Sequence, residues 1–558
     1  MKPFIILFIF CFTITTMSIA MQNDEQELRA FIDNHVKIVE PKLKAMNLAS
    51  WNASATGEKK YYDEQAVTEL DVRTIYSNKQ EFAQLKKWKD SGNIKDTLLC
   101  RQLVLLYNNY LTNQIDSVLM RKIVEKSAAI ANKFNTFRGI IDGKEVSDNE
   151  IDDNLQKETD SARRQKTWEA SKMVGKAVAP MLIELVKLRN EAARQLGYKN
   201  FYEMSLIAAE QSESEIVTLF DELAALTDAP FKTLKADIDT KLANKWGIKA
   251  SEMKPWHYQD RFFQESPQVS NVDLDQYFKD KKVEDLARIY YTQLDLPVDN
   301  IVKNSDLYGR AGKYQHAFET DIDRRGDIRV MLSVVNNQYW MSTMLHELGH
   351  AAYSNNVRRD LPFLLRSETH IFFTEAIAMM MERQASNADW LSAMVGIPES
   401  EKDAIRKAGE ESLRMHGLIF SRWTQVMMRF ERAMYQNPDQ DLNKLWWDLV
   451  EQYQLIKPPE GRNEPDWAAK IHLSQSPVYY HNYELGELTA SQLQHYIAVN
   501  VLKQTDTKNV CFANKPAVGD YLKTRVFMPG ASLRWDELMK YATDEPLTAK
   551  YFAEEFVK

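Results

Sequence analysis

The chain has 558 residues, 44% of them hydrophobic and 27% charged, with a formal net charge of −8. This composition is typical of a globular protein with a large core, and the acidic surplus excludes a nucleic-acid-binding protein that needs a basic surface. Three cysteines, Cys11, Cys100 and Cys511, are too few for a disulfide scaffold. We expect Cys100 to be a buried free thiol, although pairing with Cys511 stays open.

Residues 1–20 have the features of a secretory signal peptide. Lys2 precedes the apolar run Phe4–Phe12, and Ser18-Ile19-Ala20 is typical of a small-x-small cleavage site. The alternative is an uncleaved anchor helix, but the run is short and threonines interrupt it. No other apolar stretch is long enough to span a membrane. We therefore expect a secreted or periplasmic protein whose single mature domain is 21–558, with no stable membrane insertion after cleavage.

Apolar residues recur at helical spacing through most of the first 250 residues. Clear examples are 26–48, 96–110 and 179–196, whereas 52–57 is predicted to be a loop. Proline and glycine are few and gather at joints between these segments. The pattern predicts an all-α fold with one small β element.

That β element is predicted directly before the most informative motif of the chain. Residues 313–320 and 327–335 have strand character, and the turn between them ends in Gly326. A ribbon of this kind can pair with an extended peptide by strand addition. Asn336 and Asn337 are candidate caps for the helix that follows.

The motif is His346-Glu347-Leu348-Gly349-His350, an H-E-x-x-H pattern within an apolar helix. Residues at i and i+4 share one helix face, so His346 and His350 can place two imidazole nitrogens on one metal ion. Glu347 can then act as a general base toward a water molecule at the metal. A chance match on a core helix is the alternative, but unpaired polar groups on such a helix are costly. The motif predicts a zinc hydrolase.

A catalytic zinc ion needs a third protein ligand, because these sites have three ligands and one open position. Glu375, on the apolar helix 370–383, is the predicted third ligand, and Glu368 and Glu382 are the competing carboxylates. The metzincin pattern requires Gly and His where this chain has Tyr353 and Asn356, so that alternative is excluded.

Residues 466–488 hold many side-chain hydrogen-bond donors within a short distance. They include Lys470, His472, Tyr479, Tyr480, His481 and Tyr483. Tyrosine and histidine are also ordinary core residues with satisfied polar tips. The stretch by itself therefore leaves structural and functional roles equally open.

Taken together, HELGH, the glutamate in TEAIA, and K-x-H followed by Y-x-x-Y resemble the angiotensin-converting-enzyme family of zinc peptidyl-dipeptidases. The likeness covers nearly the whole mature chain and includes the Trp51 region, VKLRNEAARQLGY at 186–198 and LWWDL at 445–449. It implies a mostly helical, two-lobed ellipsoid with a deep central cleft. It also implies one Zn²⁺ ion and peptide substrates.

The resemblance assigns a role to each matching residue. The implied zinc ligands are His346, His350 and Glu375, and the implied catalytic residues are Glu347, Tyr483 and His472. The implied substrate-binding residues are His316, Ala317, Lys470, Tyr480 and Gln264, the last of which is the weakest match.

Four departures from the family pattern bear on these roles. The spacing from His350 to Glu375 is longer than in the mammalian pattern and matches the related thimet-oligopeptidase family. Met379 replaces an aspartate one turn past the zinc glutamate. Val450 and Asn482 stand where the family has arginines that bind chloride. An extra residue before Tyr480 allows its assigned role to move to Tyr479.

The predicted function is a zinc metallopeptidase that releases dipeptides from the C-terminus of oligopeptides. The alternative enzyme is an endo-acting oligopeptidase of the thimet type. A catalytically inactive peptide-binding or zinc-binding protein is a third possibility, against which the presence of Glu347 and Tyr483 argues. The natural peptide, its side-chain preference and the oligomeric state are not predicted.

Overall fold

The computed structural model describes residues 4–267, 272–314 and 316–557, with the side chains of 4–22 left out. The expected signal peptide therefore lies outside the residues whose side chains are described. The chain divides into two compact units. Unit 1 comprises residues up to Gln114 together with Asp280–Ala378 and Asn514–Asp544, and unit 2 comprises the remainder.

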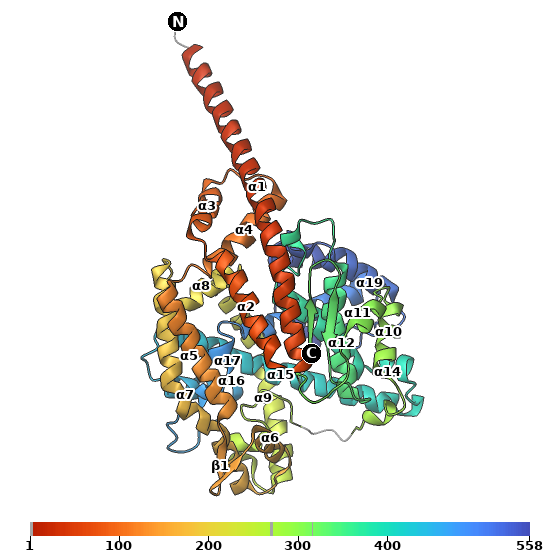
Figure 1. Cartoon of the computed structure of the whole chain (residues 1–558). Helices are drawn as coiled ribbons and strands as arrows, with labels where there is room; N and C mark the ends of the chain where they lie inside the picture. The colour runs from red at the N-terminus through yellow and green to blue at the C-terminus, as the bar shows by residue number, and fades with distance from the viewer. Residues whose placement is uncertain (1–3, 268–271, 315, 558) are drawn as a thin grey trace. The chain divides into compact units, whose positions relative to one another are not determined.

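The described residues of unit 1 form helices, several of which are labelled in Figure 1, and one two-stranded ribbon. Its main elements are α1 (Phe4–Thr56), α2 (Lys59–Tyr76), α3 (Lys79–Ser91), α4 (Thr97–Leu111), α10 (Val283–Gln293), α11 (Asp299–Asn304), β3 (Phe318–Asp321), β4 (Ile328–Met331), α12 (Gln338–Asn356), α13 (Ile371–Glu382), α19 (Pro516–Leu522) and α20 (Trp535–Thr543). Helix α13 begins in unit 1, and its last residues, from Met379, belong to unit 2.

Helices α1 to α4 of unit 1 share one hydrophobic cluster. Leu28, Leu85, Leu99 and Leu106 are almost completely buried in it. The predicted helix at 96–110 is confirmed as α4, and the Asp96 carboxylate caps it by accepting a hydrogen bond from Leu99 N at 2.8 Å.

The predicted loop at 52–57 was wrong, because α1 continues through it to Thr56. Trp51 and Ala53 are buried, and Trp51 packs with Ile322 and Met331. The helix ends at Gly57, whose φ of 69° is the left-handed conformation that glycine adopts easily. Burial of the apolar face therefore outweighed the polar residues that suggested a loop.

The β element is confirmed but is shorter than predicted. Strands β3 and β4 are antiparallel, with Phe318 opposite Met331 and Asp321 opposite Ile328. The first strand was predicted to begin at Lys313, but no strand forms there. The buried ammonium group of Lys313 donates hydrogen bonds to Asp306 O (2.9 Å), Asp306 Oδ1 (2.8 Å) and Tyr308 O (2.9 Å). Lys313 therefore organises a loop, and the strand starts only at Phe318.

Unit 2 contains a second small sheet among long helices. Its main elements are α5 (Ser117–Thr136), β1 (Gly139–Ile141), β2 (Lys144–Val146), α6 (Asp148–Lys157), α7 (Ser161–Gln195), α8 (Phe201–Ala208), α9 (Glu213–Trp246), α14 (Ala388–Val395), α15 (Glu399–Gln436), α16 (Leu442–Gln454), α17 (His472–Gln475), α18 (His481–Tyr496) and α21 (Lys550–Phe556). The predicted helix at 179–196 is the second half of α7.

The core of unit 2 is rich in large aromatic side chains. Trp168, Trp423 and Trp467 are almost completely buried, and Trp446 and Tyr480 pack with them. Helices α7, α15 and α16 supply most of this cluster.

The observed architecture confirms the predicted all-α fold with a minor antiparallel β component. In the part of the chain that the structure describes, no helix is both long and apolar enough to cross a membrane. Cys100 and Cys511 are free thiols. The two-lobed shape and the central cleft implied by the resemblance remain predictions.

Candidate functional site

Helix α12 carries the H-E-x-x-H motif and is fixed at several points in unit 1. Its N-terminus is capped by Asn337, whose side-chain oxygen accepts from Trp340 N at 2.9 Å, as the sequence predicted. The helix packs against β3, β4 and α10. From α10, the Tyr291 hydroxyl donates to Leu345 O at 2.6 Å, immediately before the first histidine of the motif.

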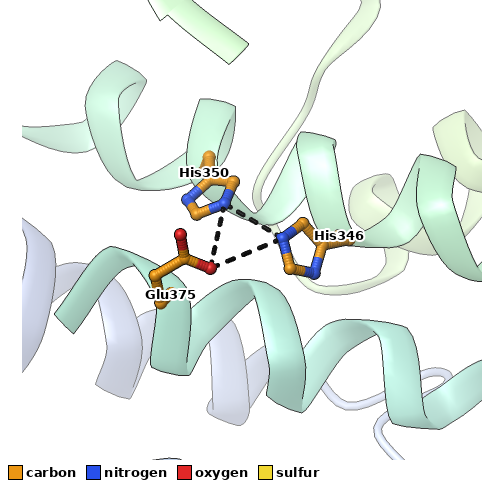
Figure 2. A group of neighbouring side chains, drawn as sticks. All are labelled: His346, His350 and Glu375. Carbon is orange, nitrogen blue, oxygen red and sulfur yellow. Dashed lines mark hydrogen bonds and ion pairs between the residues drawn. The ribbon is translucent and has the colours of Figure 1, made fainter. Parts of the chain in front are cut away.

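The two motif histidines and Glu375 converge on one point (Figure 2). His346 Nε2 and His350 Nε2 are 3.2 Å apart. Glu375 Oε2, from the neighbouring helix α13, lies 3.7 Å from His346 Nε2 and 3.8 Å from His350 Nε2. We call these three residues the metal cluster.

The hydrogen bonding of His350 suits a neutral metal ligand. Its Nδ1 lies 2.7 Å from Thr374 Oγ1, so a proton on Nδ1 leaves the Nε2 lone pair directed at the cluster. Burial and the neighbouring His346 lower the pKa of His350 well below its usual range. Because metal ligation requires the neutral imidazole, this environment favours binding of a cation at Nε2.

Gly349 allows α12 and α13 to approach closely. A Cβ atom at this position would lie 3.0 Å from Ala378 Cα and 3.3 Å from Ala378 N. Both neighbours are backbone atoms, so a side chain would push the two helices apart. The glycine inside the motif therefore sets the distance between the two histidines and Glu375.

The residues of the metal cluster fit a zinc ion. A tetrahedral zinc with bond lengths of about 2.0–2.1 Å requires ligand atoms roughly 3.3 Å apart. The observed separations of 3.2, 3.7 and 3.8 Å need only a small contraction around Glu375. Two imidazole nitrogens and one carboxylate oxygen are also a donor set found in catalytic zinc sites.

Among the carboxylates that competed for the third ligand position, Glu375 is the one that the structure brings to the histidines. The negative charge of Glu368 instead contributes to raising the pKa of Glu319 and of Tyr353. The negative charge of Glu382 contributes to raising the pKa of Arg383. Glu347, between the two histidines on α12, is 7% exposed. Its charge contributes to raising the pKa of Tyr291 well above the usual range, where burial is the main cause.

The two expected substrate-binding residues of unit 1 lie just before β3. His316 is exposed, and its ring centroid is 5.3 Å from that of Tyr314. Ala317 directly precedes Phe318, the first residue of β3. Peptide binding by these two residues and by the ribbon stays a prediction.

In unit 2, the structure brings Lys470, Gln264 and Tyr480 together. Lys470 Nζ donates to Gln264 Oε1 at 2.6 Å. The ammonium group also lies 5.2 Å from the ring centroid of Trp423 and 5.3 Å from that of Tyr480. We call Lys470, Gln264, Trp423 and Tyr480 the lysine cluster. Because Lys470 is 8% exposed, burial lowers its pKa to about 8.

The loop that carries Gln264 is organised by Asp260. Its carboxylate accepts from Phe262 N at 2.6 Å and from the backbone N–H groups of Gln264 and Glu265 at 3.1 Å each. Burial raises the pKa of Asp260 to about 6, against the lowering effect of these hydrogen bonds. The loop includes Phe263 at a φ of 52°, a conformation that is costly for a bulky residue and is held here by Asp260.

The tyrosines of the Y-x-x-Y pattern lie at the start of α18. Tyr480 accepts a hydrogen bond from Trp423 Nε1 at 2.6 Å, and its ring centroid is 5.2 Å from that of His472 and 5.3 Å from that of Tyr483. Burial, together with the charge of Lys470, lowers the pKa of His472 to about 4, so this imidazole is neutral at pH 7. Tyr479 lies beside Tyr483, with their centroids 5.2 Å apart.

Sequence reasoning missed Thr374, Asp260 and Trp423. Thr374 directly precedes the predicted ligand Glu375, and a hydroxyl at that position was the available signal. Asp260 is four residues before Gln264, a spacing suited to a side chain that accepts backbone hydrogen bonds. Trp423 comes from the middle of α15, and nothing in the local sequence of that helix marks it.

Comparison with known proteins identifies one family. The profile of the Peptidase_M2 family, described as angiotensin-converting enzyme, matches residues 22–556. Similar proteins include the mouse angiotensin-converting enzyme-like protein Ace3 (Mus musculus), 21% identical over 71% of this chain and 58% of the relative. The angiotensin-converting enzyme of Theromyzon tessulatum is 23% identical over 42% of this chain and 39% of the relative. The angiotensin-converting enzyme of Sus scrofa is 24% identical over 55% of this chain and 25% of the relative. The matches thus span less than two thirds of each relative.

Proposed function

The chain belongs to the angiotensin-converting-enzyme family of peptidases, and we propose that it is a zinc metallopeptidase that releases dipeptides from the C-terminus of oligopeptides. The convergence of His346, His350 and Glu375 on one point carries this proposal. The close packing at Gly349 and the bond from His350 to Thr374 support it, because both hold ligands in place.

A zinc ion held by the three ligands would act as a Lewis acid on the scissile carbonyl and would lower the pKa of the attacking water. Glu347 accepts the proton of that water and delivers it to the leaving amine, as a general base and then a general acid. Tyr483 and the neutral His472 donate hydrogen bonds to the oxygen that becomes negative as the carbonyl is attacked. His316 and the backbone of Ala317 bind the peptide.

Release of a C-terminal dipeptide requires recognition of a free carboxylate, and the lysine cluster suits this task. Lys470 is a buried cation that donates a hydrogen bond to the neutral amide of Gln264. The Tyr480 ring lies beside it, with its centroid 5.3 Å from Lys470 Nζ. A cation favours an anionic oxygen over an amide, because charge-assisted hydrogen bonds are the stronger kind.

Two other features of the proposal follow from the sequence. The protein is secreted or periplasmic after removal of residues 1–20, and 21–558 act as a single peptidase domain. A single family profile across 22–556 supports the second point. One zinc ion is proposed per chain, in line with the one set of His, Asp and Glu ligand atoms that meets among the described residues.

Digestion of a defined peptide mixture, followed by mass spectrometry, tests the proposal. The expected products are C-terminal dipeptides and peptides shortened by two residues. A chelator should stop the reaction, and Zn²⁺ should restore it. Activity that persists after verified removal of zinc would overturn the metal assignment.

The alternative that the sequence left open is an endo-acting oligopeptidase of the thimet type. Peptides amidated at the C-terminus separate the two modes. A dipeptide-releasing enzyme should cleave them much less efficiently than the free acids, whereas internal cleavage with equal efficiency would establish the endo-acting mode.

A further inference from the structure

The first turn of α18 carries Tyr480 and Tyr483, yet it lacks the usual side-chain cap. The helix starts at His481, and no side chain caps its N-terminus. Its first amides instead bond to the chain three residues earlier, with Asn482 N to Tyr479 O at 2.9 Å and Tyr483 N to Tyr480 O at 3.3 Å. Turns held in this way are weaker than capped helix ends, so another contact must order them.

One such contact comes from a glutamine of a different segment. Gln211 Nε2 donates to Asn482 Oδ1 at 2.8 Å, and Gln211 Oε1 lies 2.8 Å from His481 Nε2, which must be the donor because an amide oxygen accepts. All three residues are buried: Gln211 is 4% exposed, His481 is 2% exposed and Asn482 is 5% exposed. We call this arrangement the Gln211 clamp.

Gln211 is itself held rigidly. It lies between α8 and α9, and its backbone N–H donates to Leu206 O, in α8, at 2.8 Å. The residue before it, Glu210, has a φ of 59°, which closes the turn after α8. The clamp therefore ties the first turn of α18 to the end of α8, and both of its bonds are buried from water.

We propose that Gln211 is a positioning residue that fixes Tyr480 and Tyr483 through the buried side chains of His481 and Asn482. This inference rests on the proposed function, in which Tyr483 stabilises the reacting carbonyl oxygen. Residues 481 and 482 lie between the two tyrosines in sequence, so holding both of them sets the direction of the whole turn. Both contacts of the clamp join side chains of the protein itself.

Gln211→Leu, which keeps the side chain's approximate size and removes both bonds, tests the clamp. We expect kcat to fall roughly tenfold or more with KM little changed, because a small misplacement of a transition-state donor mainly affects the chemical step. Gln211→Glu keeps an acceptor for His481 and, after rotation of the Asn482 amide, an acceptor for Asn482 as well. Gln211→Glu should therefore retain most of the activity that Gln211→Leu loses.

Gln384→Leu is the matched control. Gln384 is also a buried glutamine of unit 2 with two hydrogen bonds, donating to Val510 O at 2.9 Å and accepting from Phe512 N at 2.9 Å. Its loss should lower thermal stability by a similar amount and leave kcat unchanged. Hydrogen exchange of the amides at 481–484 should accelerate in Gln211→Leu and not in Gln384→Leu, whether or not the enzyme is active.

A double-mutant cycle with Tyr483→Phe separates the clamp from the proposed catalytic role. If Gln211 acts through Tyr483, then Gln211→Leu should cost little more once the tyrosine hydroxyl is absent. Additive losses, or unchanged exchange at 481–484, would overturn the clamp while leaving the proposed function intact. An unchanged kcat in Tyr483→Phe alone would instead overturn the role of Tyr483, and the exchange experiment would still test the clamp.

Discussion

In unit 1, the metal cluster takes two of its three ligands from a single turn of α12, and its third ligand from the next long helix along the chain. In unit 2, the lysine cluster takes its members from three distant segments: the Asp260 loop, the middle of α15, and residues 470–480. One cluster is mainly a consequence of helical periodicity, and the other exists only after the chain has folded.

The two clusters also differ in how they hold charge. His350 is neutral because it is buried, and it has a neutral hydroxyl partner at Nδ1, as expected of a site that receives a cation. Lys470 is a cation held by an amide oxygen and by aromatic faces, with a pKa lowered to about 8, as expected of a site that receives an anion. The metal cluster thus offers neutral imidazole and a carboxylate, whereas the lysine cluster offers a cation.

The largest effect is expected for Glu347→Gln in the helix that carries the metal cluster. Loss of one proton-transfer group should reduce kcat by ~10²–10⁴-fold, while zinc content stays at one ion per chain. Zinc content is measured on the purified variant beside its steady-state kinetics. Glu368→Gln, which changes a nearby competing carboxylate, should retain both zinc and turnover. Full turnover by Glu347→Gln would remove Glu347 from the mechanism.

Tyr483→Phe, in unit 2, should give the next largest effect. It removes one hydroxyl and little volume, so kcat should fall by roughly 10²-fold with KM almost unchanged if the hydroxyl donates only in the transition state. Tyr479→Phe is the matched control, since its ring lies beside Tyr483. A kcat loss in Tyr479→Phe and not in Tyr483→Phe would transfer the role to Tyr479.

Gly349→Ala probes the helix packing behind the metal cluster. The added Cβ would meet the backbone of Ala378 at 3.0 Å, which forces α12 away from α13 and moves the histidines relative to Glu375. We expect zinc affinity to fall about 10-fold or more, as for the loss of other groups that orient metal ligands. Competition with a chromogenic chelator measures this affinity. Gly309→Ala, where the nearest atom is Ser333 Cβ at 3.5 Å, should bind zinc normally.

The dependence of kcat/KM on pH tests whether the lysine cluster binds the substrate carboxylate. Burial lowers the pKa of Lys470 to about 8, so its charge is present at pH 7 and is lost as the pH rises through about 8. For free-acid peptides, kcat/KM should fall by about tenfold per pH unit above that value, because binding is linked to one proton. Amidated peptides should show no such decline. The same decline with both substrates would separate Lys470 from carboxylate binding.

The smallest effect is expected for chloride. Val450 and Asn482 stand where the resembled family has chloride-binding arginines, and the Asn482 oxygen is occupied by Gln211. Arg462, a candidate replacement, is paired with the Asp466 carboxylate at 2.6 and 2.7 Å. A buried anion without a cationic partner is costly. Activity measured against chloride, with acetate holding ionic strength constant, should therefore be flat. Saturable activation by chloride would contradict this expectation.

Local sequence patterns were sufficient to predict the helical fold, the α12 cap and the three residues of the metal cluster. The reason is that helical geometry converts a spacing of four residues into shared position on one face, so His346 and His350 needed no tertiary information. Glu375 followed from its apolar surroundings and from the need for a third ligand. The strand boundary was misplaced because the bonds of Lys313 to Asp306 and Tyr308 were invisible in the local pattern.

The surroundings of these residues depend on contacts between segments that are distant in the sequence. Resemblance named Lys470, Gln264 and Tyr480, but the Trp423 bond to Tyr480 and the Asp260 bonds that shape the Gln264 loop join segments far apart in the chain. The same is true of Gln211, whose amide meets two side chains more than 250 residues away. Periodicity specifies neighbours within one element. Contacts between elements depend on how the hydrophobic faces pack, and packing brings such side chains together only when the whole unit has formed.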